Sequence, residues 1–349
     1  MEEKLFTDDE VKQQTRELWK ECFHDSDEFL DIYFSDKYEG AANLTTCREG
    51  RVVAAVQILP YRMSFYGRNV LSGYISGLCV HPDYRKQGIA SELLQRANRI
   101  LYRQGATFSF LIPGNDELRK FYEKPQHGAY WTSTYRLEVE CKPEGAETDS
   151  EIEIEQPYEW PLELYLFYRR NSGYPFIFNP SENDFYAALS TCDLEDGFVL
   201  TARRHRKLVG ICLAVPTDDK RIIIRSILVK SQKVKDAFLR YLAKKTGCEK
   251  IVAKAPAPGS MKGVEPYAMA RVVCADRLFG NVLAAYPDFQ LCIGIDEDRF
   301  VPENNGYYDL HDSKIFISDQ RPDSVVTPGG MASMFLSAHP VYTEMMLDE

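Results

Sequence analysis

The sequence lacks the segments that would tie the protein to a membrane. No apolar run among the 349 residues is long enough to cross a bilayer. The first residues, Met1-Glu2-Glu3-Lys4, are charged, which is incompatible with a secretory signal. We therefore expect a cytoplasmic protein without membrane partners.

The sequence also lacks metal and disulfide motifs. Its nine cysteines include no Cys-x-x-Cys pair, and its six histidines form no ligand cluster. An odd, scattered set of cysteines indicates reduced and mostly buried thiols. We therefore expect neither a disulfide framework nor a bound metal.

The chain has fewer basic than acidic residues. The chain has 42 Lys+Arg against 52 Asp+Glu, a formal net charge of -10. Nucleic-acid binding depends on basic side chains that neutralise phosphates, so the balance argues against a nucleic-acid partner. It favours cationic small substrates such as amines, although solubility explains it equally well. The length predicts two or three domains.

The stretch 78–90 joins an apolar strand to an amphipathic helix. His81-Pro82-Asp83 is a turn signal, and Arg85-x-x-Gly88-x-Ala90 runs directly into the helix. Small residues at Gly88 and Ala90 let the backbone approach a ligand, and free N–H groups at a helix N-terminus attract an anion. The pattern predicts a main-chain pyrophosphate site; the alternative is an ordinary strand-turn-helix.

Periodicity and turn signals predict three parts, separated by a polar linker over 142–150 and a change of pattern near 267. The first part has helices from the Thr7–Glu10 capping box to 23, over 29–34, 89–103 and 117–122, and strands over 52–59, 61–65, 75–80, 107–112 and 130–139. Ser26 or Asp27 is the expected cap of the second helix, and Gly105 is the expected C-cap of the helix 89–103. The second has helices over 161–170, 183–189 and 234–245, and strands over 197–202, 208–214, 221–229 and 250–254. The third has helices over 275–284 and 331–338 and a strand over 289–295.

The loop Arg85-x-x-Gly88-x-Ala90 resembles the acyl-coenzyme A loop of the GNAT acetyltransferase superfamily. The Met-x-Arg-Val-Val stretch at 269–273 and the Asn-Gly-x-Tyr turn at 305–308 extend the resemblance to the enhanced intracellular survival family. It implies an α+β chain with tandem GNAT (acyl-CoA N-acyltransferase) folds and a C-terminal sterol-carrier-protein-like α+β domain. The implied parts are a catalytic domain at 1–141, a degenerate copy at 150–256 and the carrier-like domain at 265–349.

The reaction that this resemblance implies is transfer of acetyl from acetyl-CoA, a cosubstrate, to a primary amine by direct attack. The acceptor would be a small amine, an aminoglycoside-like molecule or a lysine side chain of a peptide. Main-chain groups would orient the thioester and hold the pyrophosphate, and Asn115 would be a further contact to the cosubstrate. An aromatic pair, Phe29 and Tyr33, would lie beside the acceptor. The implied binding residues are Leu78, Cys79, Val80, Arg85, Lys86, Gln87, Gly88, Ile89, Ala90 and Asn115 for the cosubstrate, and Phe29 and Tyr33 for the acceptor.

Tyr122 is the candidate general acid, because Phe121-Tyr122 matches the start of the family's Phe-Tyr-x-x-x-Gly-Phe helix. A phenol near pKa 10 is a weaker acid than a thiol near 8.5, so its position matters more than its acidity. The chain departs from the family where Lys124-Pro125-Gln126-His127 precede Gly128. The alternative is that Tyr122 is only a buried aromatic residue.

The family resemblance implies that the terminal carboxylate, here Glu349, enters the active site as the base. Burial would raise its low pKa, and the alternative is a frayed tail. His127 and Glu28 are further candidates without a motif, whereas His81 is expected to be a turn residue.

A second function class is a protein that binds a lipid or another apolar ligand in the carrier-like domain, with a regulatory acetyltransferase fold. The intact loop at 85–90 favours the enzyme. The corresponding crossover in the second part, Lys230-Ser231-Gln232-Lys233, has no glycine and is expected not to bind coenzyme A. The oligomeric state is left open, with a homo-oligomer among the options.

Overall fold

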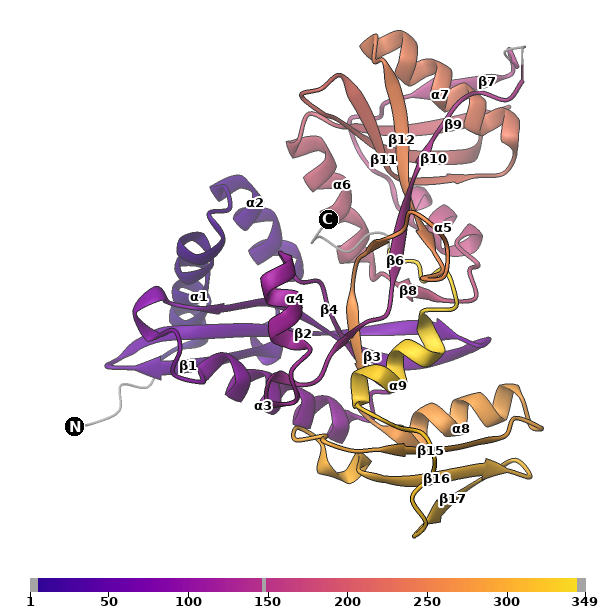
Figure 1. Ribbon diagram of the computed structural model, residues 1–349. Helices are drawn as coiled ribbons and strands as arrows, with labels where there is room; N and C mark the ends of the chain where they lie inside the picture. Colours follow the sequence, from indigo (N-terminus) through magenta and orange to yellow (C-terminus); the bar gives the residue numbers. More distant parts are fainter. Residues whose placement is uncertain (1–5, 146–148, 344–349) are drawn as a thin grey trace. The chain divides into compact units, whose positions relative to one another are not determined.

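The computed structural model describes residues 6–145 and 149–343. Within them the chain forms two compact units, traced by sequence colour in Figure 1. The first unit comprises the residues up to Tyr135, Pro175–Phe178 and Ala257–Val341. The second unit comprises Arg136–Tyr174, Asn179–Pro256 and the residues from Tyr342. The first and third parts predicted from the sequence therefore fold together.

Two capped helices open the first unit, as predicted. Helix α1 (Asp8–Phe23) begins at the Thr7–Glu10 capping box, in which each residue accepts the other's backbone N–H. Helix α2 (Asp27–Ile32) begins at Ser26, whose side chain accepts the N–H of Phe29. A π-helical turn, Tyr33–Lys37, continues α2 and buries Tyr33.

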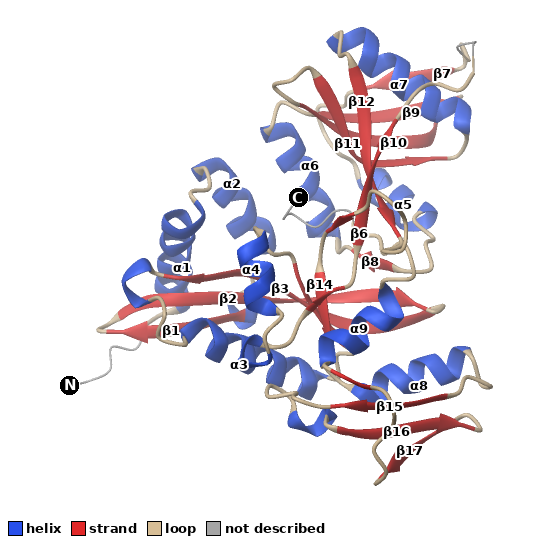
Figure 2. Cartoon of the chain, in the orientation of Figure 1, coloured by secondary structure: helices blue, strands red, loops and turns tan. Residues whose placement is uncertain are grey.

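The sheet of the first unit combines strands from distant parts of the sequence (Figure 2). Its order is β1-β2-β3-β4-β14-β5, and β8 (Ile177–Asn179) pairs with β2. The strands span Asn43–Arg48 (β1), Arg51–Phe65 (β2), Arg68–Val80 (β3), Phe108–Leu111 (β4), Met269–Val272 (β14) and Trp131–Thr132 (β5). Strand β14 comes from the C-terminal part and pairs with both β4 and β5.

Four predicted strands have clearly different bounds in the structure. The expected strands 52–59 and 61–65 are one strand, because Pro60 stays in register opposite Gly73. Strand β3 begins at Arg68, just after the Tyr66-Gly67 turn in which both residues have positive φ. The expected strand 130–139 is interrupted where the N–H groups of Ser133 and Thr134 turn to the carbonyl of Ala268. Strand β1 was missed, because its sequence is mostly polar.

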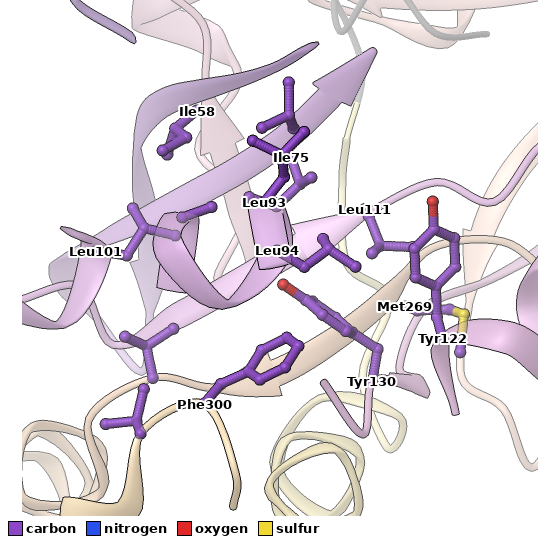
Figure 3. Close-up of a cluster of buried hydrophobic side chains, with 14 of the residues drawn as sticks. Ile58, Ile75, Leu93, Leu94, Leu101, Leu111, Tyr122, Tyr130, Met269 and Phe300 are labelled. Atoms are coloured by element: carbon purple, nitrogen blue, oxygen red, sulfur yellow. The ribbon is translucent and has the colours of Figure 1, made fainter. Parts of the chain in front are cut away.

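Helix α3 packs on strands β1, β2 and β3 of the first unit, and α4 follows strand β4. Helix α3 (Ile89–Gln104) begins at Gly88 and ends at Gly105, both with positive φ, as predicted. Helix α4 (Asp116–Tyr122) is capped by Asn115. Figure 3 shows the core that α3 covers, which includes side chains of the C-terminal part. Labelled members of that core are Ile58, Ile75, Leu93, Leu94, Leu101, Leu111, Tyr122, Tyr130, Met269 and Phe300.

A smaller sheet and two helices complete the first unit. The sheet order is β17-β16-β15-β18. The elements are α8 (Ala275–Ala285), β15 (Leu291–Ile295), β16 (Gly306–His311), β17 (Lys314–Ser318), β18 (Val325–Val326) and α9 (Pro328–Leu336). The predicted helix 275–284 and the strand 289–295 are confirmed, apart from their exact ends.

In the second unit, strands β6-β12-β11-β10-β9-β7 are neighbours in this order within a single sheet. Its strands are β6 (Tyr135–Glu140), β7 (Ile152–Glu155), β9 (Phe198–Arg204), β10 (Lys207–Pro216), β11 (Arg221–Val229) and β12 (Lys250–Ala257). Its helices are α5 (Leu162–Asn171), α6 (Glu182–Leu194) and α7 (Gln232–Thr246). The parallel pair β11–β12 is joined through α7, as the sequence predicts.

No helix in the described part of the chain is both long and apolar enough to cross a membrane.

Candidate active site

Strands β3 and β4 run parallel and then part. Their register covers Ser72–Tyr74 opposite Phe108–Phe110, whereas β3 continues to Val80. Gly77 has φ of 59°, and the pairing of β3 with β2 shifts register between Ala55 and Gln57. A Cβ on Gly77 would lie 1.7 Å from the Trp19 ring, so glycine is required at this bulge. Beyond Tyr74 the main chain of β3 therefore has no continuous hydrogen-bond ladder with β4. A ligand that binds to the main chain requires such a gap between two strands.

The loop after β3 leads into α3 with its backbone exposed. Lys86 and Gly88 have φ of 63° and 83°, and no side chain caps the helix. The first helical bond joins the Glu92 N–H to the Gly88 carbonyl at 3.1 Å. Within the described residues, the N–H groups of Ile89, Ala90 and Ser91 have no acceptor, as expected of a first helical turn. Such donors, together with the positive end of the helix dipole, are the features that favour binding of an anion.

Two further residues shape this loop. The His81 side chain accepts the Asp83 N–H at 3.3 Å, which confirms the predicted turn role. The Arg85 Nε donates to the Val80 carbonyl at 3.0 Å and places the guanidinium at the end of β3. The predicted residues Val80, Arg85 and Gly88 are therefore close together in one loop.

Tyr122 ends α4 in the core of the first unit. It is 8% exposed, and its ring centroid lies 6.2 Å from that of Tyr130. Figure 3 shows its hydroxyl directed away from Tyr130, with Leu111 at the end of β4 beside its ring. Burial raises the pKa of the Tyr122 phenol well above its usual value, so the group stays protonated at neutral pH. Such a phenol can donate a proton or a hydrogen bond.

The insertion after Tyr122 is ordered by backbone contacts. Residues Pro125–His127 form a 3₁₀ turn, and Gly128 follows with φ of 108°. The Tyr130 N–H then donates to the Tyr122 carbonyl at 2.9 Å. The Tyr130 hydroxyl is bonded to Asn98 at 2.8 Å and to Ser109 at 2.7 Å. The longer loop therefore leaves α4 firmly attached to α3 and β4.

A buried ion pair, missed in the sequence, supports the same loop from strand β14. Both oxygens of Asp298 lie 2.6 Å from Arg271 Nη2, and both residues are almost completely buried. Arg271 Nη1 also donates to the Gly128 carbonyl at 2.7 Å. Asp298 accepts further bonds from the N–H of Val301 at 2.8 Å and from Asn304 at 2.9 Å. The Met-x-Arg stretch was noted in the sequence, but nothing there identified the partner aspartate.

The two predicted acceptor residues lie on the opposite face of the sheet from α3. Ile75 belongs to the core that α3 covers, and the next residue of β3, Ser76, contacts the Tyr33 hydroxyl at 3.0 Å. Tyr33 is buried, and Phe29 is half-buried with its ring 6.5 Å from that of Tyr33. The pair therefore lies against β3 beside the Gly77 bulge.

The remaining candidates differ in their surroundings. Asn115 uses its side-chain oxygen to cap α4 through the Leu118 N–H at 2.9 Å, which leaves its amide NH₂ for a ligand. His127 stacks on Phe121 at 3.8 Å and contacts Ser91 at 2.6 Å, and burial lowers its pKa. Glu28 is exposed, and Glu349 lies outside the described residues.

Neither an acid–base pair nor a metal site is complete among these groups. Within 6–145 and 149–343, no hydrogen bond joins the Tyr122 hydroxyl to a carboxylate. In the same residues, no group of three or more His, Cys, Asp or Glu side chains is arranged to hold a metal ion.

Comparison with known proteins agrees with this geometry. Residues 4–125 match the family model described as an acetyltransferase (GNAT) domain. The matched segment includes the β3 bulge, the loop at 85–90 and Tyr122. No curated protein matches the sequence significantly.

The fold extends over nearly the whole chain in several solved structures. Eis1 from Mycobacterium abscessus has 13% identity and a TM-score of 0.73, with 95% of this chain and 88% of that chain covered. A GCN5-related N-acetyltransferase from Anabaena variabilis has 18% identity and a TM-score of 0.69, with 93% and 87% covered. One from Kribbella flavida has 16% identity and a TM-score of 0.65, with 94% and 86% covered. At these identities the likeness establishes the shared fold.

Proposed function

We propose that this N-acetyltransferase transfers acetyl from acetyl-CoA to a primary amine. The premise is that residues 4–125 are a GNAT acetyltransferase domain. The observation that supports this most is the open start of α3, where Gly88 and the unpaired N–H groups after it follow a parted strand pair. Binding of coenzyme A needs these two features together, because the molecule has a charged pyrophosphate and, attached to it, a thin, amide-containing arm that ends in the thiol.

The pyrophosphate is assigned to residues 85–90. The N–H groups of Ile89 and Ala90 supply donors without a competing side chain, and Gly88 has open space where a Cβ would stand. Lys86 and Gln87 lie exposed in the same loop, so their side chains add charge and hydrogen bonds from solvent. The amide NH₂ of Asn115 is a further donor.

The thioester is assigned to the main chain of Leu78, Cys79 and Val80. N–H groups beside the parted strands polarise the carbonyl as its oxygen gains negative charge during attack. The Gly77 bulge fixes the direction of this segment, since the Trp19 ring fills the space behind it. The acceptor amine is assigned to the face of β3 that carries Tyr33 and Phe29.

Tyr122 is assigned as the general acid. The amine attacks the carbonyl carbon, the carbon–sulfur bond breaks, and the coenzyme A thiolate takes a proton from the phenol. Burial makes Tyr122 a weaker acid than usual, so this donation is uphill and depends on the proton that the attacking amine releases. A base must take that proton from the amine and pass it on to the phenolate that the donation leaves, and Glu349 is our candidate.

The first prediction tests the pyrophosphate site. Gly88→Glu is expected to weaken acetyl-CoA binding at least 100-fold, because a carboxylate beside the helix N-terminus competes with the phosphates and repels them. Gly247→Glu is the matched control, since Gly247 also has positive φ, open space for a Cβ and a place at the end of a helix. Calorimetric titration of both variants decides; equal affinities would place the phosphates elsewhere.

The second prediction tests the base. Removing Asp348 and Glu349 is expected to lower kcat at least tenfold while the affinity for acetyl-CoA stays within twofold, because the base acts only during attack. Glu349→Gln separates the side chain from the terminal carboxylate. Steady-state rates with a panel of primary amines, aminoglycosides and peptides measure both variants and the acceptor preference. A truncated enzyme with full activity would exclude Glu349, and an ordered water would become the candidate.

A further inference from the structure

Two thiols meet on the face of β3 opposite to α3. Cys22 lies in the last turn of α1, and Cys79 lies on β3, one residue before its end. The two side chains are neighbours, and each shifts the pKa of the other. The Cys22 sulfur also lies 3.6 Å from the Val80 carbonyl, and the Cys79 sulfur 3.8 Å from the Ala55 carbonyl. The pair is therefore fixed by contacts with two neighbouring strands.

The groups around Cys22 favour the ionised, thiolate form of its side chain. The pKa of Cys22 is lowered to about 7, chiefly by the neighbouring Cys79 thiol and against an opposing effect of burial. The Arg85 guanidinium, with Nη2 at 4.0 Å from the sulfur, contributes to this lowering, and Glu21 acts weakly in the other direction. Burial and the neighbouring Cys22 raise the pKa of Cys79, so Cys79 stays protonated where Cys22 ionises.

Cys22 differs from the other cysteines in combining access with a lowered pKa. Cys79 is buried, whereas Cys22 is partly accessible to solvent. Burial raises the pKa of four other thiols, those of Cys141, Cys192, Cys212 and Cys274. Cys47 and Cys292 are more exposed than Cys22, and Cys248 is also partly accessible, but none of these three has a thiol partner in the described structure. A partly accessible thiolate beside a buried thiol is the arrangement of a peroxide-reactive site.

We propose that Cys22 is a peroxide-reactive modification site and that Cys79 is the thiol that resolves it into a disulfide. The Cys22 thiolate attacks one oxygen of hydrogen peroxide; the O–O bond breaks, a sulfenic acid forms, and the departing hydroxide is protonated to water. The Cys79 sulfur then attacks Cys22; the S–S bond forms, the S–O bond breaks, and the second hydroxide leaves as water with the Cys79 proton. Two thiols lose two electrons, and one peroxide gains them.

The disulfide would act on the cosubstrate site, a consequence that rests on the proposed function. Cys79 belongs to the segment assigned to the thioester, and Arg85 belongs to the loop assigned to the pyrophosphate. Bonding Cys79 to α1 moves its backbone, and loss of the thiolate frees Arg85 from its contact with Cys22. Oxidised protein is therefore expected to bind acetyl-CoA at least tenfold more weakly, and a thiol reductant is expected to restore binding.

The first test measures the thiolate without reference to activity. Reduced protein is alkylated with iodoacetamide from pH 5.5 to 9.5, and modification of each cysteine is followed by peptide mass spectrometry. The Cys22 rate is expected to reach half its plateau near pH 7, and at pH 7 Cys22 is expected to react at least as fast as the more exposed Cys47. A midpoint at or above about 8.5, the ordinary thiol value, overturns the proposal.

The second test follows the disulfide. Brief treatment with one to five equivalents of hydrogen peroxide is expected to give a Cys22–Cys79 peptide cross-link that a reductant removes. Cys22→Ser should show no cross-link, and Cys79→Ser should leave Cys22 as sulfenic and then sulfinic acid. Oxidation of Cys47 with Cys22 and Cys79 still reduced would overturn the proposal.

Acetyl-CoA titration of the same samples is a separate readout. The wild type is expected to lose binding on oxidation, and Cys22→Ser is expected to keep it under the same treatment. A cross-link without loss of binding supports the modification site and contradicts the assigned cosubstrate site. A protein that binds acetyl-CoA when reduced but forms no cross-link contradicts the modification site alone.

Discussion

Replacing Asp298 with alanine is expected to lower the free energy of unfolding by about 3–5 kcal/mol, because Arg271 would then be a buried charge without a counterion. Arg271 is completely buried, and its remaining acceptors are the backbone carbonyls of Gly128 and Val272. Asp298 also accepts the N–H groups of Phe300 and Val301, which the alanine would leave unpaired. Urea unfolding followed by fluorescence measures the change.

Two controls test the cause of this loss. Asp31→Ala removes an exposed partner of Arg16, and it should cost less than about 1 kcal/mol. The double variant Arg271→Met/Asp298→Leu removes both charges and should be more stable than Asp298→Ala, since no unpaired charge remains. If Asp298→Ala unfolded at the same urea concentration as the wild type, the pair would have no role in holding β14 in the sheet.

The same ion pair connects stability to the active site through short backbone links. Arg271 holds the Gly128 carbonyl, and two residues later the Tyr130 N–H holds the carbonyl of Tyr122. Strand β14, which supplies Arg271, pairs directly with β4 at the end of the parted strands. The C-terminal part therefore contributes structure to the candidate site even though its sequence is more than 100 residues away, as the pairing of Met269 with Leu111 shows.

Local signals in the sequence were sufficient for the helices. Each helix end is marked by residues next to it: the Thr7–Glu10 capping box, Ser26, Gly88 and Gly105. A capping side chain bonds the unpaired backbone groups of a helix terminus, and a glycine with positive φ lets the backbone change direction there. The loop at 85–90 also depends on local geometry. For this reason the candidate pyrophosphate site could be found before the structure.

Long-range pairing could not be predicted in the same way. Pro60 interrupts the apolar pattern of β2 and suggests a break, yet its place opposite Gly73 keeps the strand continuous. The position of β14 between β4 and β5 depends on partners far apart in the chain. The same is true of Asp298, which is one of many acidic residues in the sequence and becomes distinct only when Arg271 is buried beside it. Contacts between thiols, such as that of Cys22 with Cys79, also depend on the fold.

Tyr122→Phe is expected to lower kcat by about 10²- to 10³-fold, within the usual range for loss of general acid catalysis. Its affinity for acetyl-CoA should change less than threefold, because the hydroxyl acts mainly when the thiolate leaves. The ring remains, so its contacts with Tyr130 and the core are kept and the variant should fold. Stopped-flow or steady-state rates and calorimetric titration measure the two quantities separately.

Tyr102→Phe on α3 is the control for loss of a phenol in the same unit, and its kcat should be unchanged. The pH dependence provides a further check. Burial raises the pKa of Tyr122 above its usual range, so kcat of the wild type should not fall between pH 8 and 10 through ionisation of this group. If Tyr122→Phe turned over as fast as the wild type, the thiolate would take its proton from water or from the attacking amine, and Tyr122 would serve only to pack α4 against β4.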